Sequence, residues 1–201
     1  MDLFSFDGAY FNKGYNFIAG VDEAGRGPLA GPVSAAAVIL PKDITIDGLN
    51  DSKKLSSKKR EILFDEIIKK AISFSIAFVD NETIDNINIL QAVFLAMTKA
   101  IQSLKVLPDL CLVDGNLKIP NLKISQTTIV GGDAKSAAIA AASILAKVAR
   151  DKIMIDFAKK FPEYSFEKHK GYGSKKHIEA IKRFGICQIH RKTFSPIKDI
   201  F

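Results

Sequence analysis

The sequence predicts an α/β protein in which helices flank a mixed central sheet. Two observations predict this class. Short apolar runs typical of buried strands come first, and further runs then alternate with segments whose apolar residues recur every three or four positions, as on a helix face. With 201 residues, 47% of them hydrophobic and 25% charged, the chain can bury one core, so we expect a single domain over 1–201.

Each expected helix begins at a residue that favours a helix start. Ser56 is a suitable N-cap for the first helix, and either Asp80 or Asn81 is suitable for the second. Asp133 opens the third helix, which is rich in alanine. The expected strands are 17–21, 33–40, 74–79, 110–113 and 124–130, and the expected helices are 57–72, 81–103, 133–160 and 174–184.

Cysteine content and hydropathy exclude several classes of protein. The two cysteines provide neither a disulfide framework nor a metal-binding motif, and Cys111 lies in an apolar run typical of the core. No segment has the pattern of a signal peptide, and no apolar run is long enough to span a membrane. We therefore expect a cytoplasmic protein that acts as a monomer, without a membrane partner.

The positive charge is concentrated near the C-terminus. The net charge is +7, and residues 147–192 contain 13 Lys and Arg against 5 Asp and Glu, whereas the rest of the chain contains 16 and 17. This distribution predicts a positive face that binds a polyanion. A solvated helix face with spare lysines explains the charge equally well, so charge alone does not decide between them.

Two adjacent acids, Asp22 and Glu23, follow the first strand and precede Gly25-Arg26-Gly27. Side chains of neighbouring strand residues point to opposite faces, so both acids reach one site only where the strand ends and the backbone turns. The glycines allow that turn and leave N–H groups exposed, and Arg26 between them is suited to bind a phosphate. The alternative is a strand that ends in a polar turn, which explains this combination less well.

Two further acids occupy comparable positions. Asp114 follows the buried strand at 110–113, where open α/β sheets bind ligands, although Asp114-Gly115 is also a common turn. Asp133 follows two glycines, and its alternative role is that of a helix N-cap. If the alanine-rich helix after it packs unusually close to the sheet, Asp133 lies near the other acids.

Acids that converge where histidines are few suggest Mg²⁺ or Mn²⁺ held by oxygen atoms. Two such ions about 4 Å apart activate water and stabilise the leaving oxygen of an in-line phosphodiester displacement. This chemistry needs no covalent nucleophile, and the sequence contains no clear Ser–His–Asp or Cys–His arrangement. The acids therefore predict a metal-dependent phosphodiesterase.

The segment His169–His177 combines basic residues, glycines and one aromatic ring. Tyr172 is suited to stack on a sugar or base, and Lys175 and Lys176 are suited to bind phosphates. The alternative is a glycine turn before the last helix, with Tyr172 as a partly buried cap. Lys53, in a lysine-containing loop, is a further candidate phosphate contact.

Taken together, these motifs resemble the bacterial ribonuclease HII family, in the order in which that family carries them. The resemblance runs from about residue 17 to 197, and the first motif is the most specific. The related class ribonuclease HIII lacks the tyrosine that Tyr172 matches. The matching segments are Gly20–Val33, 51–56, 113–116, 132–135, 140–151 and 169–173.

The resemblance implies a ribonuclease-H-like fold, with a catalytic core over about 17–160 and a small C-terminal helical, substrate-binding part over about 161–201. It also implies that four acids hold the metals, that a glycine loop reads the 2′-hydroxyl of the ribonucleotide, and that a tyrosine stacks on the sugar after it. By position these are Asp22, Glu23, Asp114 and Asp133 for the metals, Gly25, Arg26 and Gly27 for the loop, and Tyr172 for the tyrosine.

The implied activity is endonucleolytic hydrolysis of the RNA strand of RNA–DNA hybrids. The family also cuts on the 5′ side of single ribonucleotides in duplex DNA, leaving 3′-hydroxyl and 5′-phosphate ends, and so starts ribonucleotide excision repair during DNA replication. A four-carboxylate exonuclease would need a different first motif. A non-catalytic basic nucleic-acid-binding domain is disfavoured, because clustered acids weaken binding to a polyanion unless metal neutralises them.

Overall fold

The computed structural model describes residues 2–200 and contains one five-stranded sheet in the order β3-β2-β1-β4-β5. β1 pairs antiparallel with β2 and parallel with β4, β2 pairs antiparallel with β3, and β4 pairs parallel with β5. The mixed sheet is thus confirmed. The strands are β1 Ile18–Ala24, β2 Val33–Ile39, β3 Ser73–Val79, β4 Leu110–Asp114 and β5 Ser125–Ile129.

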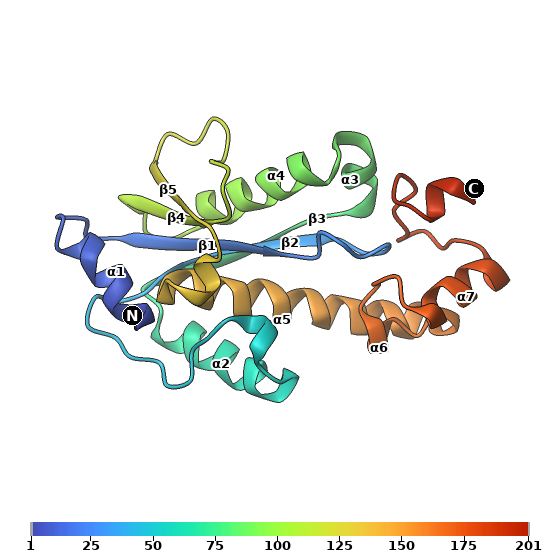
Figure 1. Ribbon diagram of the computed structural model, residues 1–201, viewed down its shortest axis with the longest axis horizontal. Helices are drawn as coiled ribbons and strands as arrows, with labels where there is room; N and C mark the ends of the chain where they lie inside the picture. Colours follow the sequence, from blue (N-terminus) through green and yellow to red (C-terminus); the bar gives the residue numbers. More distant parts are fainter. Residues whose placement is uncertain (1, 201) are drawn as a thin grey trace.

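Helices cover both faces of this sheet (Figure 1). α3 and α4 pack on one face, and α2 and the long α5 pack on the other. No helix within residues 2–200 is long and apolar enough to cross a membrane. The helices are α1 Leu3–Phe11, α2 Ser57–Lys70, α3 Asn81–Ile87, α4 Ile89–Gln102, α5 Ala137–Lys160, α6 Phe166–His169 and α7 Lys175–Phe184.

The alanine-rich start of α5 lies directly against β1. A Cβ atom added at Gly20 would be 2.0 Å from the carbonyl carbon of Ala138, so only glycine permits this approach. Residues 137–146 of α5 are all buried, and most are alanine, which leaves little side-chain bulk between helix and sheet. The expected close packing is confirmed, and it fixes the segment before α5 beside the carboxyl ends of β1 and β4.

The expected helix over 81–103 is two helices in the structure. Asn88 separates α3 from α4 with a φ of 66°, in the left-handed region, and its side-chain oxygen accepts hydrogen bonds from the N–H groups of Leu90 and Gln91. Asparagine tolerates this conformation and caps helices well, so it ends one helix and starts the next. The apolar periodicity continues across the break, which is why the sequence pattern did not reveal it.

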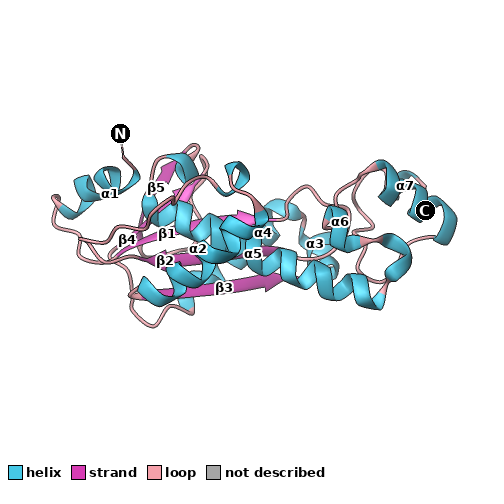
Figure 2. Ribbon diagram, turned by 90° about the horizontal axis from the view of Figure 1, so that it is seen from below, coloured by secondary structure: helices cyan, strands magenta, loops and turns pink. Residues whose placement is uncertain are grey.

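A separate apolar cluster lies beyond the far end of α5. α6, α7 and the following chain pack with Met154 and Ala158 of α5, around the buried Phe166 and Ile181. Figure 2 shows this part at one end of an elongated molecule, with α1 at the other end.

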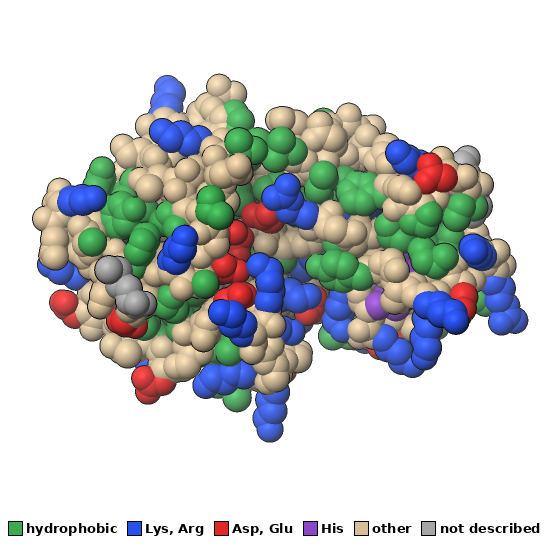
Figure 3. Space-filling model, viewed as in Figure 1, with side chains coloured by type: hydrophobic (Ala, Val, Ile, Leu, Met, Phe, Trp, Pro, Cys, Tyr) green, Lys and Arg blue, Asp and Glu red, His purple; other side chains and the backbone are tan. Residues whose placement is uncertain are grey.

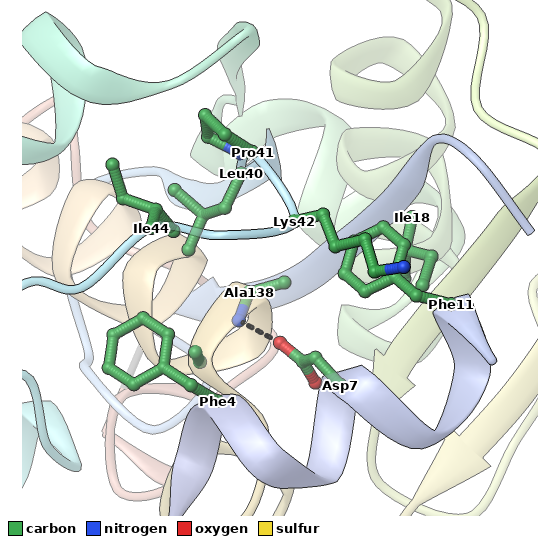
Figure 4. Close-up of a pocket in the computed structure, with 10 residues that line it drawn as sticks. Phe4, Asp7, Phe11, Ile18, Leu40, Pro41, Lys42, Ile44 and Ala138 are labelled. Atoms are coloured by element: carbon green, nitrogen blue, oxygen red, sulfur yellow. Dashed lines mark hydrogen bonds between the residues drawn. The ribbon is translucent and has the colours of Figure 1, made fainter.

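The sequence did not predict α1, which Asp2 caps and which packs near the start of α5. Its Asp7 is only 6% exposed and accepts a hydrogen bond of 2.8 Å from the N–H of Ala138 through Oδ2 (Figure 4). The other oxygen, Oδ1, is buried without a hydrogen-bond partner within residues 2–200. Burial raises the pKa of Asp7 to about 6, and hydrogen bonds to the start of α5 offset part of that rise.

We expect Asp7→Asn to make stability less dependent on pH. The folded state holds the Asp7 proton more tightly than the unfolded state, so wild-type stability falls as pH rises from about 4 to about 6. Asn stays neutral, so the free energy of unfolding of the variant relative to wild type should rise by about 2–3 kcal/mol from pH 4 to pH 8. Urea unfolding across this range measures the difference, with the exposed Asp65→Asn as control. A difference that does not change with pH would contradict the role of burial.

Candidate active site

Asp22 and Glu23 lie within β1, which continues to Ala24, and not after its end as the sequence predicted. Both residues remain paired with β2, but the pairing of β1 with β4 stops at Val21 opposite Val113. The strand that ends beside these two acids is therefore β4, and not β1 itself. Because no strand among the described residues flanks β1 on that side beyond the end of β4, side chains from both faces of β1 reach the same opening.

Asp133 does not cap α5, because Ser136 does so by accepting a hydrogen bond from the N–H of Ile139. Instead Asp133 lies in a 3₁₀ turn, Gly132–Ala134, that packs against the end of β4. The N–H of Gly132 donates to Asp114 Oδ1 at 2.6 Å, which holds this turn beside Asp114. Lys53, from the lysine-containing loop, donates to Asp133 Oδ2 at 3.0 Å.

A cleft of about 270 Å³ opens over these strand ends. Figure 3 shows acidic side chains gathered in a hollow between the two halves of the molecule, with basic side chains around it. Of the predicted site residues, Asp133, Lys175 and Lys176 do not line the cleft; both lysines are exposed on α7. Those that line it are Asp22, Glu23, Asp114, Gly25, Arg26, Gly27, Lys53 and Tyr172.

Three of the acids have pKa values above the ordinary range. Burial is the main cause for Asp22, and repulsion from Glu23 and Asp114 raises its pKa further. Burial also raises the pKa of Glu23, against the nearby Arg26. For Asp114, burial is again the largest cause, and the charge of Asp133 adds to it. The site thus concentrates negative charge that a cation would stabilise.

The donors present fit a divalent metal ion, but the carboxylates are not arranged as a closed cage. Within residues 2–200, no three Asp, Glu, His or Cys side chains converge as a ready ligand set. Two of the acids instead form ion pairs with basic side chains: Arg26 Nη1 lies 3.2 Å from Glu23 Oε1, and Lys53 Nζ lies 3.0 Å from Asp133 Oδ2. Carboxylate oxygens are the hard ligands that Mg²⁺ and Mn²⁺ prefer, and the side chains of Lys53 and Arg26 are exposed enough to move aside.

Tyr172 stands at the edge of the cleft with 46% of its surface exposed. A Cβ atom added at Gly27 would lie 3.7 Å from Tyr172 Cε1, so the ring faces the glycine loop. The carbonyl of Tyr172 accepts hydrogen bonds from the N–H of Ser174 at 2.8 Å and from His177 Nδ1 at 2.9 Å. The tyrosine is therefore an anchored residue with an exposed ring, and not a buried helix cap.

A chain of buried histidines continues behind this carbonyl. The N–H of Cys187 donates to His190 Nδ1 at 2.9 Å, so His190 carries its proton on Nε2. That nitrogen lies 3.0 Å from His177 Nε2, which leaves His177 Nδ1–H to donate to Tyr172. Burial lowers the pKa of each histidine to about 4, so both are neutral at pH 7.

The sequence interpretation missed two buried arginines of the basic stretch. Arg150 is 1% exposed and Arg191 is fully buried, so neither contributes to a positive surface. Their guanidinium groups donate to backbone carbonyls around the glycine loop. Lysine and arginine in a basic segment normally indicate a surface, and no local pattern distinguishes these two.

The mixed five-stranded sheet with helices on both faces is a ribonuclease-H-like fold. The crystal structure of ribonuclease H2 from Pyrococcus horikoshii OT3 matches it with a TM-score of 0.76 and 28% identity, covering 92% of this chain and 96% of that one. The model of the family Ribonuclease HII matches residues 19–197. The chain belongs to the ribonuclease HII family of endoribonucleases.

Curated relatives agree with this assignment over nearly the whole chain. Ribonuclease HII of Endomicrobium trichonymphae is 65% identical over 199 residues, which cover 99% of this chain and 95% of the relative. Ribonuclease HII of Caldicellulosiruptor bescii is 57% identical over 193 residues, which cover 96% and 93%. The family resemblance predicted from the motifs is thereby confirmed.

Proposed function

We propose that the protein is a metal-dependent endonuclease that hydrolyses the RNA strand of RNA–DNA hybrids. It also cuts on the 5′ side of single ribonucleotides embedded in duplex DNA, leaving 3′-hydroxyl and 5′-phosphate ends. One observation supports this proposal most strongly. The cleft combines three carboxylates that repel one another, one of them buried and two partly buried, with a glycine loop and a half-exposed tyrosine, so ligands for cations and contacts for a nucleotide face the same space.

In this proposal Asp22, Glu23, Asp114 and Asp133 hold two divalent ions, Mg²⁺ or Mn²⁺. When bound, the ions supply charge stabilisation for the attacking and leaving oxygens of the phosphodiester. The chain's own contribution is to hold the carboxylates in a fixed arrangement: Gly132 orients Asp114, and the N–H of Glu23 donates to Asp22 Oδ1 at 2.7 Å.

Substrate recognition falls to the loop Gly25-Arg26-Gly27, to Tyr172 and to Lys53. The loop presents backbone groups to the 2′-hydroxyl, the group that distinguishes RNA from DNA at one position. The ring of Tyr172 stacks on the following sugar, and the C-terminal part over about 161–201 contributes this residue. Lys53 and Arg26 exchange their carboxylate partners for phosphate when metal enters.

Cleavage of an end-blocked duplex with one central ribonucleotide tests the proposal. We expect cutting at the 5′ side of the ribonucleotide with Mg²⁺ or Mn²⁺, and no cutting of an all-DNA duplex of the same sequence. Blocked ends exclude an exonuclease. Tight binding without cleavage in either metal would instead support a non-catalytic nucleic-acid-binding domain.

The basic surface should make duplex binding depend steeply on salt, because bound lysines release counterions from phosphates. We expect the double variant Lys175→Gln/Lys176→Gln to reduce the slope of log affinity against log salt by about 1 to 2. The control is Lys13→Gln/Lys42→Gln, two exposed lysines at the α1 end of the molecule. An unchanged slope in the α7 variant would mean that these lysines face away from the substrate.

A further inference from the structure

The glycine loop is the start of a longer segment, 25–32, that crosses between the core and the C-terminal part. Three backbone hydrogen bonds, each of 2.8 Å, join the segment to the C-terminal part of the protein. The N–H of Leu29 donates to the carbonyl of Gly171, that of Gly31 to the carbonyl of Ile189, and that of Arg191 to the carbonyl of Leu29. A Cβ atom added at Gly171 would lie 2.5 Å from the carbonyl oxygen of Ala30. The backbone of segment 25–32 is therefore in direct contact with the backbone of the C-terminal part.

Behind this segment lie the two buried arginines, which arrive from α5 and from the C-terminal chain. Arg150 donates to the carbonyls of Pro32, Ala30 and Lys170 at 2.8, 3.0 and 3.0 Å. Neither arginine forms an ion pair with a carboxylate within residues 2–200. A guanidinium group stays charged in proteins, so two positive charges are buried here whose hydrogen-bond acceptors within residues 2–200 are all carbonyl oxygens.

Arg191 contacts the part of the segment that faces the cleft. Its Nη2 donates to the carbonyl of Gly25 at 2.7 Å and its Nη1 to the carbonyl of Arg26 at 3.0 Å, while Nε donates to Gly31 at 3.0 Å. The first two carbonyls belong to the peptide units whose N–H groups are those of Arg26 and Gly27. Within residues 2–200 neither N–H donates a hydrogen bond, and both residues line the cleft.

Two physical consequences follow from this geometry. Carbonyls that are turned inward onto Arg191 leave the N–H side of the same planar peptide units directed away from it. A charge-assisted hydrogen bond to a carbonyl also polarises its peptide unit, which makes the N–H a stronger donor. Arg191 thus acts on both the direction and the strength of the N–H groups of the glycine loop.

We propose that Arg191 is a positioning residue that makes the glycine loop selective for a ribonucleotide, with Arg150 bracing the back of the same segment. This inference rests on the proposed function, because it assumes that the loop reads the 2′-hydroxyl. Arg191 itself is fully buried and does not touch the nucleic acid. Its effect passes through the two peptide units that it orients.

The test is Arg191→Lys in the background of Asp22→Asn, which keeps the duplex uncut. Lysine retains the positive charge but does not reproduce the fork that bridges three carbonyls. The measured quantity is the ratio of dissociation constants for an all-DNA duplex and the same duplex with one ribonucleotide. We expect Arg191→Lys to lower this ratio about fivefold to tenfold, with little change in affinity for all-DNA. The exposed Arg183→Lys on α7 is the matched control and should leave the ratio unchanged.

The outcomes separate this inference from the proposed function. If the Asp22→Asn parent does not prefer the ribonucleotide duplex, the proposed reading of the 2′-hydroxyl fails, whatever Arg191 does. If the parent shows the preference and a folded Arg191→Lys variant keeps it, the role of Arg191 is overturned. Should Arg191→Lys not fold, Phe194→Leu keeps the arginine but removes the ring 5.0 Å from its guanidinium. This variant should lower the ratio by a smaller factor, and an unchanged ratio would overturn the proposal.

Discussion

Replacing Asp22 with Asn is expected to reduce the rate of cleavage by more than about a hundredfold. Residues that only hydrogen-bond to a metal ligand already cost up to about a hundredfold when they are replaced, and loss of a ligand itself should cost more. The same is expected for Asp114→Asn. Asp22 lies in β1 directly after its pairing with β4 stops, Asp114 ends β4, and both side chains line the cleft. An amide has no negative charge to hold Mg²⁺ or Mn²⁺, so on the proposed function the variant should bind the required cation poorly.

The variants should nevertheless be folded and bind substrate. Asp22 is buried with a raised pKa, so a neutral amide of the same shape removes repulsion instead of a stabilising contact. Removing one negative charge from a polyanion-binding cleft should also leave duplex affinity equal or higher. Measurements are the single-turnover cleavage rate, the melting temperature and the dissociation constant in the same buffer. Asp156→Asn, an exposed acid near the end of α5, is the control with normal activity.

If purified Asp22→Asn or Asp114→Asn cleaves at the wild-type rate, that acid does not hold a metal ion that the reaction needs. A loss of activity that is accompanied by unfolding would assign them a structural role instead. The combination that supports the proposal is lost cleavage with retained melting temperature and retained binding.

Local pattern was sufficient to predict the strands and most of the candidate residues that line the cleft. Apolar runs that end in acids predicted the positions of Asp22 and Asp114, and glycines predicted the loop between Gly25 and Gly27. The same patterns placed the end of β1 wrongly, because the length of a strand depends on its partners, and β2 extends the pairing of β1 beyond the end of β4.

What the sequence did not predict depends on contacts between distant segments. Arg150 and Arg191 are 118 and 160 positions away from the carbonyls of Pro32 and Gly31 that their Nε atoms contact. Asp133 appeared as an N-cap because aspartate favours that position and the alanine-rich helix follows it, whereas Ser136 takes that role and Asp133 pairs with Lys53. Burial and partner choice of this kind are properties of the folded chain, and no local spacing encodes them.

The second large effect is expected for Tyr172→Ala on a DNA duplex that carries one ribonucleotide. The ring is 46% exposed and faces Gly27, and the backbone of Tyr172 is held by hydrogen bonds, from its N–H to His169 and from Ser174 and His177 to its carbonyl. Alanine keeps that carbonyl and its bond to His177, so the fold and the metal ligands should be retained. What would be lost is the surface on which, in the proposed function, the sugar after the ribonucleotide stacks.

On the proposed function, the scissile phosphate would then no longer be held over the acids. A displacement of about 1 Å is sufficient to reduce the rate on the order of a hundredfold, and we expect a loss of this size for Tyr172→Ala. Tyr172→Phe keeps the ring and should retain most activity if stacking matters, but not if the hydroxyl donates an essential hydrogen bond. Phe184→Ala removes an aromatic ring of similar exposure on α7, outside the cleft, and is the matched control. Cleavage rates, the melting temperature and metal affinity together decide the role: normal cleavage by Tyr172→Ala, or failure through unfolding alone, would make Tyr172 a packing residue.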